Sequence, residues 1–303
     1  MADSDLYAEV EAILAEVNER IQAPVEDAKL LRLHSNAIFA LPSAGLVIRI
    51  AIKSGARDRV AASVAVTRLL SSRGFPCVVP AGSDQQPLVV RGHAVSIWRY
   101  ESTVREPRPT GADLGEILRS LHEQPAPSHC PGQFDPPFSS VVNAIETTPD
   151  AMSSSDRDWL NGRIAELRGL WLDLEFPYPP SLIHGDAHPN NLMRTSRGEI
   201  LLGDWDHVAI GPREWDLMQV HYTRRRFGRP SANDIERFTA TYGWDVREWP
   251  GLGTLIAARE ISGLSSYIRT APSKSFARKQ LAHRLHTLRH GDVMARWESP
   301  PPE

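Results

Sequence analysis

The stretch His184-Gly-Asp-Ala-His-Pro-Asn-Asn191 carries the strongest signal in this sequence. It follows a short apolar run at 181–183, and two further apolar runs, at 192–194 and 199–203, come after it. Ser196-Arg-Gly198 lies between these two runs and predicts the turn of a β-hairpin. Asp204-Trp-Asp206 ends the second run, so ionisable side chains stand at the ends of short strands, a common way of presenting chemistry from a rigid support.

Asp186, Asn191 and Asp204 have the residue types and the spacing that phosphoryl transfer requires. This reaction demands positioning, charge neutralisation and an oriented nucleophile, with little covalent chemistry from the protein. A carboxylate at position 186 can accept the proton of an attacking hydroxyl. The amide oxygen at 191 and the carboxylate at 204 are hard ligands, suited to Mg²⁺ bound beside phosphate oxygens.

The same stretch, together with the segment 203–217 that follows it, resembles the aminoglycoside phosphotransferase family of small-molecule kinases. The resemblance implies a protein-kinase-like fold and transfer of the γ-phosphate of ATP, with Mg²⁺, to a hydroxyl of a small molecule. It also implies that Asp186 is the catalytic base and that His184 braces the catalytic loop. Asn191 and Asp204 correspond to the Mg²⁺ ligands of the family.

Two further acidic residues follow in the same segment. The resemblance implies that Asp216, which opens a helix after Pro212, stabilises the catalytic loop from below. Asp206 has two equal interpretations. It is either a second acidic contact near the metal or substrate, or a solvated turn carboxylate.

The resemblance extends more weakly through the first hundred residues. Ser35 and Asn36, between two predicted strands, resemble the phosphate-covering loop of the family. Residues 97–100 fall where the adenine-binding hinge is expected, which makes Trp98 and Tyr100 candidate contacts of the nucleotide, with core or hinge packing as their alternative role.

Two positions depart from the family pattern. Arg49 stands where the family has a phosphate-binding lysine, and because it keeps the charge and donates in a fork, phosphate binding is still expected. Ser63 stands where the family has the glutamate that pairs with that lysine, and a hydroxyl cannot form an ion pair. Glu9, Glu11 and Asp58 are the alternative partners for Arg49.

These features predict an α+β protein with a bilobal, protein-kinase-like fold. The expected N-terminal lobe, residues 1–97, has helical spacing at 6–21 and 57–73 and strand-like runs at 28–33, 37–41, 46–52, 88–90 and 93–100. A hinge is expected at 98–101. The expected C-terminal lobe, 102–303, is mainly helical, with helices around 114–121, 160–171, 231–243, 252–270 and 274–289 and a linking loop at 125–149.

Composition excludes several classes of protein. The net charge of −3 does not suggest a nucleic-acid binder, and no apolar run approaches the roughly 20 residues that span a bilayer. Cys77 and Cys130 are isolated in the sequence, so they predict neither a metal pair nor a disulfide framework. We therefore expect a cytoplasmic protein, which we take to be monomeric or homodimeric. The resemblance implies that its partner is a small-molecule hydroxyl acceptor.

The acceptor itself is left open by the sequence. An aminoglycoside-like antibiotic would make the protein an antibiotic-resistance enzyme, whereas cyclic-peptide antibiotics, amino alcohols, sugars and nucleosides are other acceptors of this kind. Residues 181–303 contain 17 Lys and Arg against 14 Asp and Glu. A site for a polycationic drug needs spare carboxylates around it, and this half of the chain does not obviously supply them.

Two other functions compete with the kinase hypothesis. In a metal-dependent hydrolase, His184, Asp186 and His188 would share one face of a strand, and residues 204–207 would complete a two-metal site. In a catalytically impaired, nucleotide-binding relative of kinases, the substitutions at Arg49 and Ser63 would have removed turnover.

Overall fold

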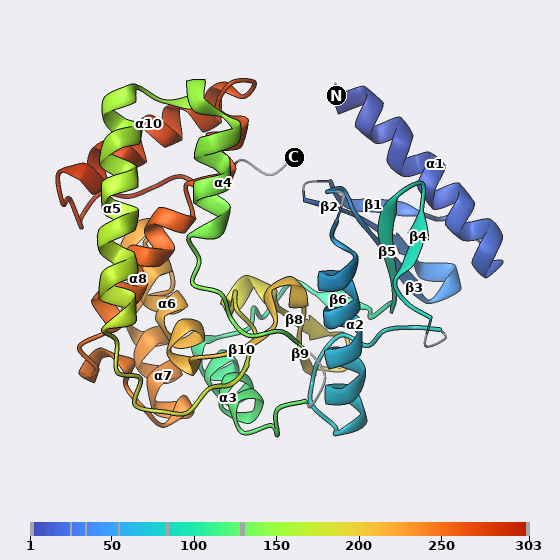
Figure 1. The fold of residues 1–303 in the computed structure, drawn as a ribbon. Helices are drawn as coiled ribbons and strands as arrows, with labels where there is room; N and C mark the ends of the chain where they lie inside the picture. The colour runs from blue at the N-terminus through green and yellow to red at the C-terminus, as the bar shows by residue number, and fades with distance from the viewer. Residues whose placement is uncertain are drawn as a thin grey trace.

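The computed structural model describes residues 3–24, 26–33, 35–53, 55–82, 85–127 and 131–300 of the 303-residue chain. Cys130 therefore lies outside the described residues, and Cys77 is a buried free thiol. Figure 1 shows two lobes, a small one built on a sheet and a larger one built mainly of helices. The predicted α+β class and the bilobal architecture, with a small sheet lobe and a larger, mainly helical lobe, are confirmed.

The N-terminal lobe is a five-stranded antiparallel sheet in the order β1-β2-β3-β5-β4, with α1 packed on one face (Figure 1). Apolar residues of α1 at helical spacing, Val10, Ile13 and Val17, pack with Ile48 and Ile50 of β3 in one buried cluster. The elements are α1 (Asp3–Ile21), β1 (Lys29–Leu33), β2 (Asn36–Leu41), η1 (Pro42–Ala44), β3 (Leu46–Ala51), α2 (Arg57–Ser72), β4 (Leu88–Val90) and β5 (His93–Arg99).

The chain leaves this sheet after Arg99 and enters the second lobe at β6 (Thr103–Val104). β6 pairs with β8 (Leu192–Thr195), which pairs in turn with β9 (Ile200–Leu202). β7 (Ser181–Ile183) pairs with β10 (Ala209–Gly211). Two short 3-10 turns follow these strands, η3 (Pro189–Asn191) after β7 and η4 (Trp205–His207) after β9. The polar stretches 184–191 and 204–206 therefore lie where the small sheets face the first lobe (Figure 1).

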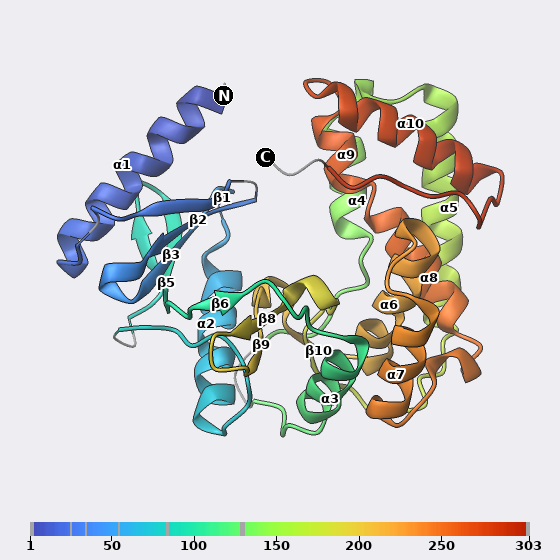
Figure 2. The ribbon, with the colours of Figure 1, turned by 180° about the vertical axis from the view of Figure 1, so that it is seen from behind.

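Helices form the rest of the second lobe, and its apolar stripes merge into the largest core cluster of the described residues. Figure 2 shows α6 and α8 beside one another, with α4 and α9 on the side that faces the first lobe. The helices are α3 (Gly111–His122), α4 (Ser139–Thr147), α5 (Ser154–Leu172), α6 (Arg213–Phe227), α7 (Ala232–Tyr242), α8 (Leu252–Ser262), α9 (Ser265–Thr270) and α10 (Ser275–Arg289), with η2 (Pro149–Ala151) and η5 (Val246–Glu248) between them.

Two sequence expectations were wrong in this lobe. The expected helix 252–270 is two helices, because the first ends at Gly263 and α9 starts at Ser265. The expected loop at 125–149 contains α4, which buries Val141, Ala144 and Ile145 at helical spacing. None of the helices that the structure describes is long and apolar enough to cross a membrane.

Candidate active site

The loop after β7 begins with His184, which is fully buried and uses both ring nitrogens inside the protein. Nε2 lies 2.8 Å from the carbonyl oxygen of Gly203, and Nδ1 lies 3.3 Å from the backbone nitrogen of Asp186. Because a carbonyl only accepts and a backbone N–H only donates, the ring is the Nε2–H tautomer. This histidine therefore fastens the loop to the end of β9 and has no free nitrogen for a metal.

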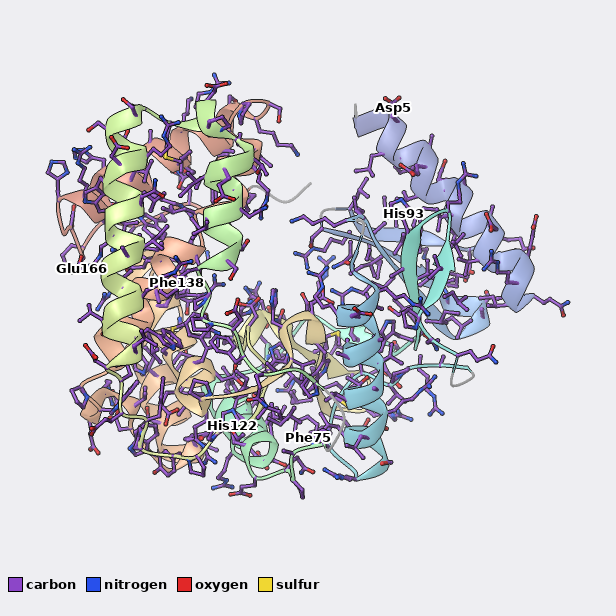
Figure 3. All side chains as sticks on the ribbon, in the orientation of Figure 1. Asp5, Phe75, His93, His122, Phe138 and Glu166 are labelled. Carbon is purple, nitrogen blue, oxygen red and sulfur yellow. The ribbon has the colours of Figure 1, made fainter. Side chains whose placement is uncertain are left out.

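Asp216, in the first turn of α6, holds the same loop from the other side. Its carboxylate accepts hydrogen bonds from the backbone nitrogens of His184, at 2.7 Å, and Gly185, at 2.8 Å. His122 of α3 lies 3.2 Å from the same carboxylate and 2.9 Å from the hydroxyl of Tyr242 in α7. The side chains of His122, Asp216 and Tyr242 are buried. Burial lowers the pKa of His122, although Asp216 opposes that shift. Figure 3 shows His122 among the packed side chains of the second lobe.

Asp186 lies on this loop with its carboxylate at the edge of a cavity of about 1780 Å³. One carboxylate oxygen accepts a hydrogen bond from Arg259 at 3.1 Å, and the other lies 3.7 Å from Nε2 of His188. Burial would raise the pKa of Asp186, but His188 and the charge of Arg259 outweigh burial and hold it well below its usual range. The group is therefore ionised near neutral pH and can accept a hydrogen bond from a hydroxyl.

Asn191 and Asp204 supply oxygen donors beside Asp186. The side-chain nitrogen of Asn191 donates to the carbonyl of Asp186 at 2.9 Å, which leaves the amide oxygen as the atom able to bind a cation. Asp204 has a left-handed backbone with φ of 56°, a conformation uncommon outside glycine and often found at functional sites. An amide oxygen and a carboxylate are the donors that Mg²⁺ prefers, so these residues fit that ion.

Arg49 of β3 joins the first lobe to this group of acids. Its guanidinium nitrogen NH2 donates to Asp204 at 2.8 Å and to Asp206 at 2.6 Å, and Asn36 donates to the same oxygen of Asp206 at 3.1 Å. Burial would raise the pKa of Asp204, but the charge and hydrogen bond of Arg49 outweigh it and lower that pKa. Asp206 therefore contacts the first lobe, as an ion-pair and hydrogen-bond partner.

Among the described residues, Arg49 pairs with none of the alternative partners Glu9, Glu11 and Asp58. Glu9 is 3.2 Å from His93, which Figure 3 places on the sheet beside α1. Asp58 lines a smaller cavity, and Ser63 is buried in α2 with its hydroxyl unpartnered among the described residues. The positive charge at position 49 is thus balanced across the two lobes and not within the first.

Of the other candidates from the sequence, Ser35 lies at the large cavity, whereas Trp98 and Tyr100 make contacts within the first lobe. Ser35 lines the large cavity together with Asp186 and Asp206. Trp98 is buried in a small cluster under α2, where its indole nitrogen donates to Ser96 at 2.9 Å. The backbone nitrogen of Tyr100 donates to Gly45, at the turn between β2 and β3, at 2.9 Å.

Sequence reasoning missed Arg259. This residue of α8 lies against the ring of Tyr222, with its charge centre 5.1 Å from the ring centroid, and its Nε donates to Gln219 at 3.2 Å while NH2 reaches Asp186. The available signal was a charged pair, Arg259 and Glu260, at the end of an otherwise apolar helix. A charge in such a place usually has a specific partner.

The sequence matches the model of one protein family, described as the phosphotransferase enzyme family, over residues 30–253. A search of the curated proteins finds no match.

Solved structures share the fold at low sequence identity. The amicoumacin kinase hAmiN, in complex with AMP-PNP, Ca²⁺ and its ligand Ami, is 14% identical, with a TM-score of 0.69 and coverage of 96% of this chain and 98% of that one. A choline/ethanolamine kinase family protein from Mesorhizobium loti is 20% identical, with a TM-score of 0.60 over 90% and 88% of the two chains. The aminoglycoside phosphotransferase APH(3'')-Id from Streptomyces rimosus is 16% identical, with a TM-score of 0.62 over 84% and 98%.

Proposed function

The chain belongs to the phosphotransferase enzyme family, and from this premise we propose that it transfers the γ-phosphate of Mg-ATP to a hydroxyl group of a small molecule. The family makes it a small-molecule kinase, and that assignment replaces the hydrolase hypothesis. To this assignment we add the identity of the nucleotide, the metal ion and the roles of individual residues. Nucleotide use is supported by the similar amicoumacin kinase, which was solved with AMP-PNP.

One observation carries this proposal: a single buried network fixes the loop that bears Asp186 and Asn191. Asp216 and His184 hold that loop through four contacts between 2.7 and 3.3 Å, so its polar groups are positioned before any ligand arrives. Phosphoryl transfer depends on such positioning more than on covalent chemistry.

In the proposed reaction, the ionised carboxylate of Asp186 accepts the hydrogen bond of the acceptor hydroxyl and then its proton. Its low pKa keeps it ionised near neutral pH, so it can both orient the hydroxyl and accept its proton. Asn191 and Asp204 would hold Mg²⁺, which neutralises charge on the phosphates. Arg49, Ser35 and Asn36 would contact the nucleotide phosphates, with Tyr100 at the hinge beside the base and the buried Trp98 packed behind it.

The test is ADP release from Mg-ATP against a mixed panel of hydroxylated amines, sugars, nucleosides, hydroxy acids and peptide antibiotics. Asp186→Ala and the isosteric Asp186→Asn should each lower kcat by about 10²–10⁴-fold, the usual worth of a general base, while ATP binding stays nearly unchanged. Asp204→Ala should instead weaken Mg-ATP binding itself. Near wild-type transfer by Asp186→Asn would remove Asp186 from the role of base.

A catalytically impaired, nucleotide-binding protein is the second candidate. It is favoured by the bonding of Arg49 to Asp204 and Asp206 and by the lack of a carboxylate at Ser63. ATP binding without acceptor-dependent ADP release, across the whole panel, would support this candidate over the kinase. Acceptor-dependent release that Asp186→Asn abolishes would eliminate it.

A further inference from the structure

The large cavity beside Asp186 is unusually rich in positive charge. Among the described side chains that line it, seven are Lys or Arg and four are Asp or Glu. Each of the four acids already has a partner. Asp186 contacts Arg259, Asp206 contacts Arg49, Asp135 accepts from Ser139 at 2.6 Å, and Glu298 accepts from Gln280 at 3.3 Å.

Three of the basic side chains form a cluster of Lys53, Arg59 and Arg269, called here the cationic cluster. Lys53 follows β3, Arg59 lies in the first turn of α2, and Arg269 lies in α9 of the other lobe, so the cluster spans the space between the lobes. Figure 2 shows α9 on the face of the second lobe that looks toward the first lobe and the upper end of α2.

The cationic cluster has no acidic partner among the residues that the structure describes. Arg269 donates only to Ser140, at 3.3 and 3.4 Å, and to Ser265, at 3.5 Å, which are neutral groups that fix its direction. Lys53 and Arg59 are exposed, and a partial loss of hydration together with the nearby charges of Arg269 and Arg59 lowers the pKa of Lys53. Three cations that repel one another without a counter-ion are a site at which an anion is stabilised.

Resting on the proposed function, we infer that the acceptor of this kinase carries an oxyanion, a carboxylate or a phosphate, as well as the hydroxyl that is phosphorylated. The cationic cluster binds the oxyanion while Asp186 orients the hydroxyl at the other part of the same cavity. A polycationic acceptor is disfavoured, because seven basic side chains line the cavity against four acids, and two of those acids already pair with arginines.

The substrate arm of the test uses matched acceptors. Hydroxy acids are compared with their amides, and sugar phosphates with the free sugars, by kcat/KM in the ADP-release assay. The charged member of one pair should be preferred by about tenfold or more, as loss of a charge-assisted contact predicts. Preference for the hydroxy acids over their amides identifies the oxyanion as a carboxylate. Preference for the sugar phosphates over the free sugars identifies it as a phosphate. Equal rates for charged and neutral members, or better rates with amines, would overturn the inference.

The protein arm uses Arg269→Gln, Lys53→Gln and Arg59→Gln, with Arg57→Gln as the matched control. Arg57 is an exposed residue of the same first turn of α2 and does not line the cavity. Each cluster variant should raise the KM for the acceptor about tenfold and leave the KM for ATP unchanged, whereas the control changes neither. A rise only in the KM for ATP would assign the cluster to the nucleotide and contradict the inference.

The two proposals can fail separately. If no acceptor supports ADP release, phosphate transfer itself fails, and the cationic cluster is then tested by calorimetric titration of the hydroxy acids and sugar phosphates into the nucleotide-free protein. Binding that Arg269→Gln weakens about tenfold, and that Arg57→Gln leaves unchanged, keeps the oxyanion site. Binding that is absent, or is equal in the wild type and Arg269→Gln, rejects it.

Discussion

Gly185 has a backbone conformation and a surrounding that only glycine can satisfy. Its φ is 83°, and a Cβ built there would lie 2.2 Å from the carbonyl oxygen of His207. Its neighbour Asp186 can therefore approach η4 only because position 185 has no side chain. The glycine of the motif is a steric requirement of the site, in addition to a turn residue.

Gly185→Ala should lower the free energy of unfolding by about 2–4 kcal/mol, because backbone strain and a backbone clash act together. Gly198→Ala is the matched control, since Gly198 has a φ of 87° but no neighbour within 4 Å of the added Cβ. It should cost about 1 kcal/mol from strain alone. Urea denaturation measures both, and equal costs would show that the contact with His207 relaxes freely.

Arg259 is a positioning residue whose effect should appear in a pH profile. In the proposed role, Asp186 must be ionised to act, so kcat/KM falls as the pH drops through the pKa of Asp186. Arg259 is one of the groups that hold this pKa well below its usual range, so the wild-type profile should show no acid limb from Asp186 where the protein is active, whereas the limb of Arg259→Gln should move up toward that range. A purely structural role would scale kcat/KM equally at every pH and produce no such limb.

The sequence motif predicted which site residues lie together, and it did so for a physical reason. Asp186, Asn191 and Asp204 lie within 19 positions and share one loop and one hairpin, so their proximity could be predicted from the chain. Arg259 reaches Asp186 from 73 positions away, on a helix that carries no motif. Contacts of that kind depend on how helices pack, and residue spacing does not encode them.

Helix α3 packs closely on α7 because two glycines face it. A Cβ at Gly111 would lie 2.0 Å from the backbone oxygen of Asp234, and one at Gly115 would lie 2.6 Å from that of Phe238. These glycines are four positions apart and so share one face of α3. The close approach brings His122 of α3 within hydrogen-bonding distance of Tyr242 of α7, and so supports the carboxylate of Asp216.

Gly115→Ala should therefore lower stability by about 1–3 kcal/mol, although alanine is the better helix former. Gly162→Ala, in α5, is the control, because nothing lies within 4 Å of its added Cβ. There the substitution should raise stability by about 0.5–1 kcal/mol. Thermal unfolding of the two variants measures the difference in sign, and stabilisation by both would mean that α7 shifts at no cost.

The elements themselves were predicted well where the apolar pattern is long. The apolar stripe of α1 runs over about four turns and that of α5 over about three, and both helices were found. α4 was missed because its buried stripe has only three residues and lies within a proline-rich stretch. The break at Gly263 was missed because apolar residues continue on both sides of it, and an isolated glycine does not necessarily end a helix.

Across the whole molecule, the last described segment is anchored by buried arginines. Arg226 lies 2.6 Å from Glu260, and its charge centre lies 4.6 Å from the ring centroid of Trp297. Arg284 lies over the same ring at 4.6 Å and donates to the backbone oxygen of Glu298 at 2.9 Å. A run of basic residues such as Arg224-Arg-Arg226 usually lies on a solvated helix face, but Arg226 is buried, because its partners come from distant parts of the chain.

Trp297→Ala should lower the free energy of unfolding by about 3–5 kcal/mol, since the side chain is only 3% exposed and its indole nitrogen donates to Thr287 at 3.1 Å. Met294→Ala is the control in the same segment, because Met294 is 74% exposed and should change stability by less than about 0.5 kcal/mol. A small loss for Trp297→Ala, measured by denaturant unfolding, would mean that this segment adds little to the fold.

Three expectations stay predictions. They are the division into lobes at residues 98–101, the cytoplasmic location, and the monomeric or homodimeric state. The bilobal architecture is confirmed. It could be predicted because the apolar pattern alternates over a strand-rich first third of the chain and becomes helical in the remainder. The contacts between the lobes were beyond that pattern, since they rest on single side chains such as Arg49.

Under the proposed function, the bonds of Arg49 to Asp204 and Asp206 would make the binding of the metal and the binding of the nucleotide reciprocal. Anionic phosphates that attract the guanidinium leave Asp204 free, and a cation that takes Asp204 leaves the guanidinium free. Each ligand should then raise the affinity for the other by the same factor, as a coupling free energy requires. In the free protein, the arginine neutralises the acids that would hold the metal, so metal and nucleotide are expected to enter together as one complex.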